Sequence, residues 1–168
     1  PAAAAVETLG SVTVLAVDKT GTLTEGHMTV RQIWTPSGAW ELGGTGYGVD
    51  GELIAAGADD DGDADEDLRL LLRDVVLCND ARLDGPDGPV WEVVGDPMEA
   101  ALLVAAAKHD RSSLELPGTW RRTDEVPFDS VTKQMTTLHH GPAGNLLVVK
   151  GAPETVVPLV ADTAVAES

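Results

Sequence analysis

Hydrophobic and polar positions recur with different periods along the chain, and each period predicts a different kind of element. The run SVTVLAV (residues 11–17) is short, nearly all apolar and rich in β-branched residues. Such a run is typical of a strand buried on both faces of a parallel sheet. The segment LRLLLRDVVLCND (68–80) carries Leu and Val at helical spacing and predicts an amphipathic helix. Asp96 and Pro97 form a good N-cap and N1 pair, which predicts a helix running to about Lys108.

Shorter patterns predict an antiparallel sheet flanked by helices, a fold of the α+β type within the broad α/β class. Strands are expected at 28–34, 91–95, 119–130, 134–140 and 145–152, turns at 36–38 and 83–89, and a short helix at 153–160. The glycine-rich segment 39–53 has no clear period, and the acidic run 59–67 predicts an exposed loop. Strand 11–17 needs parallel neighbours that the other patterns do not supply, so we expect this chain to be a fragment.

Charge and cysteine content exclude several classes of protein. The 168 residues include 11 basic and 28 acidic ones, a net charge of −17, which argues against nucleic-acid binding. The single cysteine, Cys78, excludes an internal disulfide, fits a reducing compartment and is expected only to pack. No apolar run approaches the ~20 residues that span a bilayer, and residues 1–10 lack the basic start of a signal peptide.

The acidic run and the histidines give no metal-site pattern. DDDGDADED (59–67) fails the calcium-loop pattern, because the sixth position is Ala64 and the twelfth is Leu70. The four histidines lack metal-ligand spacing, and His139 and His140 should point to opposite faces of a strand. We therefore expect the acidic run to be solvated.

Asp18 follows the predicted strand 11–17 directly, in VDKTGTLTEG (17–26). Catalytic groups of α/β sheets gather at the carboxyl ends of strands, and a carboxylate can attack a phosphoryl group. Lys19, the turn amides and the hydroxyls of Thr20 and Thr22 would supply the positive charge and donors that phosphoryl transfer needs. The alternative is that Asp18 only closes an Asx-turn.

The seven residues DKTGTLT (18–24) resemble the phosphorylation motif of the P-type ATPases. The resemblance implies that Asp18 accepts the γ-phosphate of ATP, with Lys19 and Thr20 in the catalytic loop. It also implies Mg²⁺ bound by the Asp18 carboxylate and the Thr20 main-chain carbonyl. Related phosphatases carry a second Asp where this chain has Thr20, so the phosphoenzyme should persist, as a pump requires.

Three further stretches resemble signatures of the nucleotide-binding domain in the same family. They are VGDPMEAALL (94–103), VPFDSVTKQMTTL (126–138) and VVKGAPE (148–154), and LCNDARL (77–83) also resembles a family stretch. Met98 replaces the usual Thr, and Ser130 stands where some members carry Arg. The resemblance implies a nucleotide site made of Glu99 near the adenine amino group, Phe128 stacked on adenine, Lys133 and Met135 at its border, and Lys150 with Gly151.

Each signature has a structural alternative. The alternatives are that Glu99 is an exposed residue of a well-capped helix, that Phe128 is an ordinary core ring and that Lys150 is a strand-edge lysine. The four signatures occur in the family's order, which favours the functional interpretation. We therefore expect residues 1–26 to be a piece of the phosphorylation domain and residues 27–168 to be a nucleotide-binding domain truncated at its C-terminal end.

The resemblance predicts the ATP-binding domain of a cation-pumping P-type ATPase, with ATP and Mg²⁺ as cofactors and no activity in this fragment alone. Its partners would be the remaining phosphorylation, actuator and transmembrane domains of a parent in the cell membrane, with this domain on the cytoplasmic side and not itself membrane-inserted. Residues 1–10 resemble the calcium-type branch, and the His-Pro pair of the heavy-metal pumps is absent. The alternatives are a stand-alone nucleotide-binding or regulatory module without turnover and a small phosphatase of the same superfamily.

Overall fold

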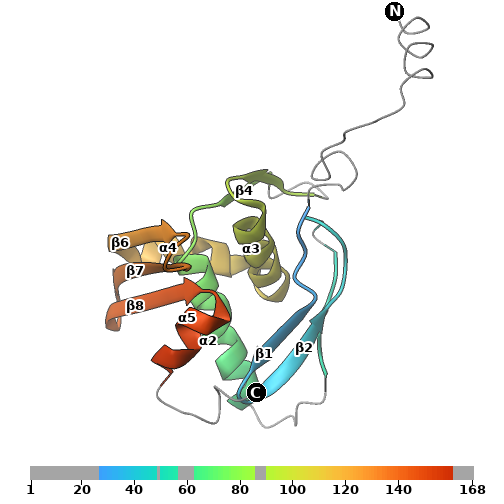
Figure 1. Cartoon of the computed structure of the whole chain (residues 1–168). Helices are drawn as coiled ribbons and strands as arrows, with labels where there is room; N and C mark the ends of the chain where they lie inside the picture. Colours follow the sequence, from blue (N-terminus) through green and yellow to red (C-terminus); the bar gives the residue numbers. More distant parts are fainter. Residues whose placement is uncertain (1–26, 49, 57–62, 86–89, 161–168) are drawn as a thin grey trace, which may run out of the picture.

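Helix α2 (Asp63–Leu77) lies between a three-stranded sheet and the β1–β2 hairpin, with α3 packed against it (Figure 1). The computed structural model describes residues 27–48, 50–56, 63–85 and 90–160. The predicted strand 11–17 and its loop lie outside this part of the chain. The other described elements are β1 (Gln32–Thr35), β2 (Gly38–Leu42), β3 (Leu53–Ala55), β4 (Arg82–Asp84), β5 (Glu92–Val94), α3 (Pro97–His109), η1 (Arg111–Glu115), α4 (Leu116–Thr119), β6 (Arg121–Asp129), β7 (Gln134–Gly141), β8 (Gly144–Gly151), α5 (Pro153–Val156) and η2 (Val157–Leu159).

The described strands form three antiparallel sheets, in the orders β1-β2-β3, β4-β5 and β6-β7-β8. Helices pack against them, so the α+β prediction is confirmed. In β7 the side chains of Met135, Thr137 and His139 are buried, whereas His140 is exposed. The alternation follows from the two-residue period of a strand and confirms that the two histidines face opposite sides.

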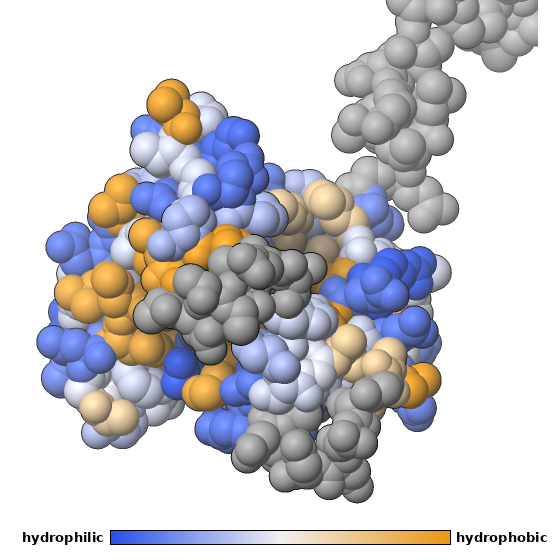
Figure 2. Space-filling model, turned by 60° about the horizontal axis from the view of Figure 1, so that its bottom comes forward, coloured by the Kyte–Doolittle hydropathy of each residue, from blue (hydrophilic) through white to orange (hydrophobic). Residues whose placement is uncertain are grey.

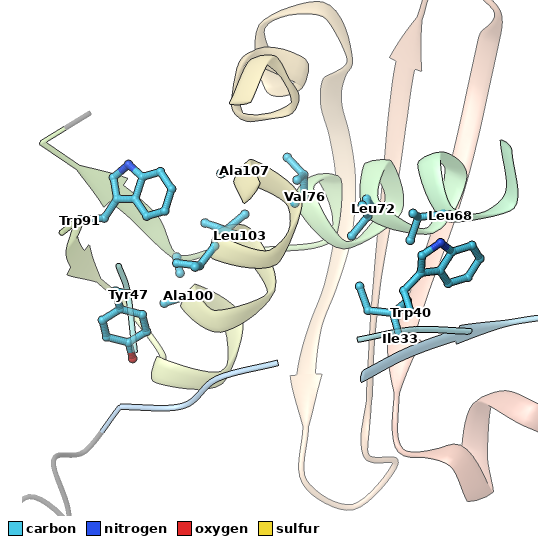
Figure 3. Close-up of a cluster of buried hydrophobic side chains, with 13 residues drawn as sticks. Ile33, Trp40, Tyr47, Leu68, Leu72, Val76, Trp91, Ala100, Leu103 and Ala107 are labelled. Atoms are coloured by element: carbon cyan, nitrogen blue, oxygen red, sulfur yellow. The ribbon is translucent and has the colours of Figure 1, made fainter. Parts of the chain in front are cut away.

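The main core is formed by α2, α3 and the β1–β2 hairpin. Figure 3 shows Ile33 and Trp40 of the hairpin beside Leu68 and Leu72 of α2. At the other end of the same core, α3 packs with Ala100, Leu103 and Ala107 near Tyr47 and Trp91 (Figure 3). Alanine allows close helix packing because its side chain is short, and it has the highest helix propensity.

The sheet β6-β7-β8 leaves large apolar side chains in water. Val126, Phe128 and Leu147 are each about three-fifths exposed. On the side where Figure 1 places this sheet, Figure 2 shows hydrophobic residues in patches between hydrophilic ones. The sheet therefore covers α2 with one face only.

Helix α2 differs from its predicted range at both ends. It begins at Asp63, inside the acidic run expected as a loop, because carboxylates near a helix N-terminus interact favourably with the helix dipole. Glu66 also pairs with Arg69 three residues later, at 2.7 Å. The helix ends at Leu77 and not at Asp80, because the Asn79 side chain donates to the Val75 carbonyl and accepts from the Ala81 amide.

Strand boundaries near the chain's glycine-rich part also differ. β1 covers Gln32–Thr35 and not 28–34. β2 runs from Gly38, in the predicted turn, into the segment without a clear period, and β3 begins at the last residue of that segment. The residues expected as a turn at 83–89 begin in β4, which pairs with β5. The helix from Pro97, the three strands β6 to β8 and the short helical segment after Ala152 are confirmed.

Candidate functional site

A cavity of about 340 Å³ brings the three signature stretches together. It is lined by Asp80, Gly95, Asp96, Met98, Glu99, Phe128, Met135 and Lys150. Four of the six residues predicted to bind the nucleotide are therefore neighbours, although they come from α3, β6, β7 and β8. A cavity of equal volume between α2, α3 and β4 contains none of the predicted site residues.

The start of α3 is held rigidly on one side of the cavity. The Asp96 carboxylate caps the helix by accepting from the amides of Met98 at 2.8 Å and Glu99 at 3.2 Å. Gly95 has a φ of +118°, and a side chain there would place Cβ 2.9 Å from Ala81 Cα. Only glycine fits both the positive φ and this close approach, so the sequence Gly-Asp-Pro sets the position of Glu99.

Glu99 and Lys150 form an ion pair across the cavity. Lys150 Nζ donates to Glu99 Oε1 at 2.6 Å, and the two side chains are 18% and 12% exposed. The second carboxylate oxygen, Oε2, accepts from the Asp80 amide at 3.0 Å. A carboxylate has about four acceptor positions. The contacts with Lys150 and Asp80 use two of them. Lys150 lies on the edge strand β8, but its side chain is turned toward Glu99 and not toward water.

Phe128 and Met135 supply the apolar part of the cavity. The Phe128 ring is 59% exposed, so it is not a core ring, whereas Met135 is buried with 1% exposure. Met98 is half-exposed at the cavity. An accessible ring beside a carboxylate and an ammonium group suits a flat heteroaromatic ligand that carries a donor and negative charge.

Cys78 lies beneath this lining. It is fully buried in a small cluster with Met135 and Val148, and its Sγ is 3.9 Å from the Met135 carbonyl oxygen. Burial raises the pKa of the Cys78 thiol. These contacts agree with the packing role predicted for it.

Lys133 and Gly151 are not among the cavity-lining residues. Lys133 Nζ pairs with Glu154 Oε1 at 2.7 Å, and this hydrogen bond raises the pKa of Lys133 and lowers that of Glu154. A Cβ on Gly151 would lie 2.5 Å from the Lys133 carbonyl oxygen. The close packing of these two strand ends explains the glycine without a ligand, an explanation that the sequence did not suggest.

Arg122 is a charged residue near the cavity that sequence reasoning missed. Its guanidinium donates to Asp80 Oδ1 at 2.6 Å and to Glu125 Oε2 at 2.8 Å. Burial by itself lowers the pKa of Arg122, but these hydrogen bonds outweigh burial and leave it above its ordinary value. No local pattern marks Arg122. Its partner Asp80 lies in LCNDARL, which resembles a family stretch, but no role was predicted for Asp80.

The predicted catalytic and metal-binding residues Asp18, Lys19 and Thr20 lie outside the described residues. Within the described ranges, no group of three or more His, Cys, Asp and Glu residues is placed to hold a metal ion. No helix in the same ranges is long and apolar enough to cross a membrane.

Comparison with known proteins identifies the family. The sequence model of the family described as P-type ATPase, cytoplasmic domain N, matches residues 67–167, more than half of the chain. The chain therefore belongs to the P-type ATPase family, and the resemblance seen in its motifs is confirmed.

Curated relatives match nearly the whole chain. The chain is 43% identical to "Probable cation-transporting ATPase F" of Mycobacterium tuberculosis (strain ATCC 25618 / H37Rv) over 92% of its length and 17% of the relative. It is 41% identical to "Cation-transporting ATPase pma1" of Synechocystis sp., over 91% of the chain and 17% of the relative. It is 34% identical to "Calcium-transporting ATPase" of Bacillus subtilis, over 91% of the chain and 17% of the relative. The chain spans about a sixth of the length of these relatives.

Proposed function

We propose that this chain is the ATP-binding part of a cation-transporting P-type ATPase and that ATP binds in the cavity between α3 and the β6-β7-β8 sheet. One observation carries the proposal: Glu99, Phe128, Met135 and Lys150 come from three separate signature stretches and line one cavity. In this proposal adenine stacks on Phe128, its amino group donates to Glu99, and the ammonium of Lys150 faces the negatively charged part of the nucleotide.

The chemistry of the lining supports a nucleotide as the ligand. An aromatic face stabilises a stacked base by about 1–3 kcal/mol. The Glu99 carboxylate is a hydrogen-bond acceptor, and the ammonium of Lys150 is already held 2.6 Å from Glu99 Oε1. A ligand therefore meets charged groups that are positioned before it binds, which lowers the cost of ordering them.

The role of the first residues follows from the same family membership. We propose that residues 1–26 belong to a phosphorylation domain and residues 27–168 to the nucleotide-binding domain. The γ-phosphate would pass to Asp18, with Lys19 beside it. Carboxylate and carbonyl oxygens suit Mg²⁺, which Asp18 and Thr20 would hold and which would neutralise charge on the transferred phosphate. The transported cation, the membrane location and the other pump domains belong to this proposal as well.

The test is an ATP titration followed by two-dimensional NMR on the wild type, Phe128→Ala and Lys150→Ala. We expect binding on the order of millimolar, about −4 kcal/mol. The changes in amide chemical shift on addition of ATP should be largest near residues 95–99, 128–135 and 148–151. Loss of the stacked ring should weaken binding by about 1–3 kcal/mol.

Val131→Ala is the matched control. Val131 lies in the turn between β6 and β7, is 87% exposed and is not part of the cavity lining. This variant should bind ATP like the wild type. Wild-type shifts that fall outside the cavity, or Phe128→Ala binding as tightly as the wild type, would contradict the proposal.

A further inference from the structure

Arg122, at the start of β6, ties together the segment that follows α2. Its side chain is 28% exposed. The Nη2 atom donates to the carbonyls of Leu77 at 3.1 Å and Asn79 at 2.7 Å, while Nη1 donates to the Asp80 carboxylate at 2.6 Å. A planar guanidinium can satisfy several acceptors in fixed directions, which a lysine ammonium cannot do in the same geometry.

The segment held by Arg122 in turn holds Glu99. The Asp80 amide donates to Glu99 Oε2 at 3.0 Å, and the Asn79 side-chain amide donates to the Glu99 carbonyl at 3.0 Å. Asn79 is buried, and its own position also depends on the Val75 carbonyl. Arg122 is therefore one residue removed from the carboxylate that faces the cavity, although it does not line the cavity itself.

Arg122 also changes the charge that a ligand would meet. The lining contains three carboxylates, Asp80, Asp96 and Glu99, and a single cation, Lys150. Lys150 pairs with Glu99 and Arg122 pairs with Asp80. Without Arg122, the Asp80 carboxylate would be left uncompensated beside any anionic ligand and would repel it.

We infer that Arg122 is a positioning residue of the nucleotide site, which orients Glu99 through the 77–80 segment and neutralises Asp80 toward the phosphates. The inference rests on the proposed function, and Arg122 is not among the residues that line the cavity. Arg122 should affect binding in two ways. Orientation of Glu99 acts on the base, whereas neutralisation of Asp80 acts only on a charged ligand.

The two effects can be measured with two ligands. Titrations of Arg122→Lys and Arg122→Gln with adenosine and with ATP, at low and high salt, are compared with the wild type. Arg122→Lys keeps the charge but loses the planar guanidinium and its several donors. The affinities for adenosine and for ATP should therefore fall by a similar factor, about tenfold. Arg122→Gln should lower the affinity for ATP more than the affinity for adenosine. The additional loss of ATP affinity should become smaller at high salt, because salt screens the Asp80 charge.

Arg121→Gln is the matched control, since it removes the same charge from the neighbouring exposed residue on the opposite face of the strand. A second readout needs no ligand: Arg122→Lys should shift the amides of Asp80 and Glu99, and Arg121→Gln should not. If Arg122→Gln does not fold, Arg122→Lys still tests the orientation effect through both readouts.

The outcomes separate this inference from the proposed function. If the wild type binds no nucleotide in the cavity, the proposed function and this inference both fail. If the wild type binds but both Arg122 variants, folded, bind adenosine and ATP as it does, only the inference about Arg122 fails. Equal losses of ATP and adenosine in Arg122→Gln at every salt concentration would overturn the neutralising effect.

Discussion

Two regions of the molecule, which meet at α3, are held together in different ways. In the first region, α2, α3 and the β1–β2 hairpin bury large apolar side chains against each other, among them Trp40 and Leu68. In the second region, the cavity between α3 and the sheet is bridged by ion pairs and hydrogen bonds, such as Glu99 with Lys150. The apolar Phe128 stays exposed there.

The difference falls at the residues proposed to bind the nucleotide. Burying a Phe side chain contributes about 1.5–3 kcal/mol, so an exposed ring beside a cavity forgoes that contribution. Partly buried charges also cost desolvation, which their pairing only offsets. The first region follows the rules of a core, and the second departs from them at the residues proposed to bind the nucleotide.

The largest expected effect lies in the core region. Leu68 is 1% exposed, and Leu68→Ala should lower the free energy of unfolding by about 2–5 kcal/mol through lost burial and a residual cavity. Leu147→Ala, on the sheet, should change it by less than about 0.5 kcal/mol, since Leu147 is 62% exposed. Urea denaturation measures both variants. If the two variants lost equal free energy of unfolding, the contrast between the two regions would be wrong.

The ion pair at the cavity should come next. Glu99→Gln leaves the ammonium of Lys150 without its charged partner and should cost about 1–3 kcal/mol of unfolding free energy. Lys150→Met should behave similarly, and the double variant should lose less than the sum of the two. A coupling energy of about 0.5–3 kcal/mol is expected from the double-mutant cycle. Additive losses would show that the pair does not join α3 to β8.

The cap of α3 is a smaller and more local test. Asp96→Ala removes the acceptor for the amides of Met98 and Glu99 and should cost about 1 kcal/mol. Asp96→Asn keeps a side-chain acceptor and should stay close to the wild type in thermal denaturation. If the two variants lost equal stability, the charge at the helix end, and not the cap, would set the position of Glu99.

The exposed pair Lys133 and Glu154 should show the smallest effect, which concerns pH. Its hydrogen bond lowers the pKa of Glu154 in the folded state. The pair therefore stabilises the fold above the ordinary carboxyl pKa, and this contribution is lost as the pH falls through the lowered value. NMR titration of the Glu154 carboxyl should show its pKa rising in Lys133→Met and staying unchanged in Lys150→Met.

Much of the fold was predictable from local patterns. The N-cap pair Asp96–Pro97 marked the start of α3, and Gly and Pro between alternating runs marked β6 to β8. Strands β2 and β3 were missed because their alternation is short and glycine surrounds it. The sequence favours a core or rim position for Trp40, and the packing of α2 beside it places it in the core. The start of α2 (63–67) was missed because a short run rich in carboxylates has the composition of a solvated loop. Its helical conformation depends on the apolar helical segment that follows it.

The sequence by itself determined the family and singled out four residues that line the cavity, Glu99, Phe128, Met135 and Lys150, because short motifs such as KGAPE occur in a recognisable order. Only the tertiary structure decided which of those residues meet. Glu99 and Lys150 are 51 positions apart, and Arg122 reaches Asp80 across 42. Local patterns carry no information on such contacts, since they arise when helices and sheet pack and the cost of closing the intervening chain is offset by burial.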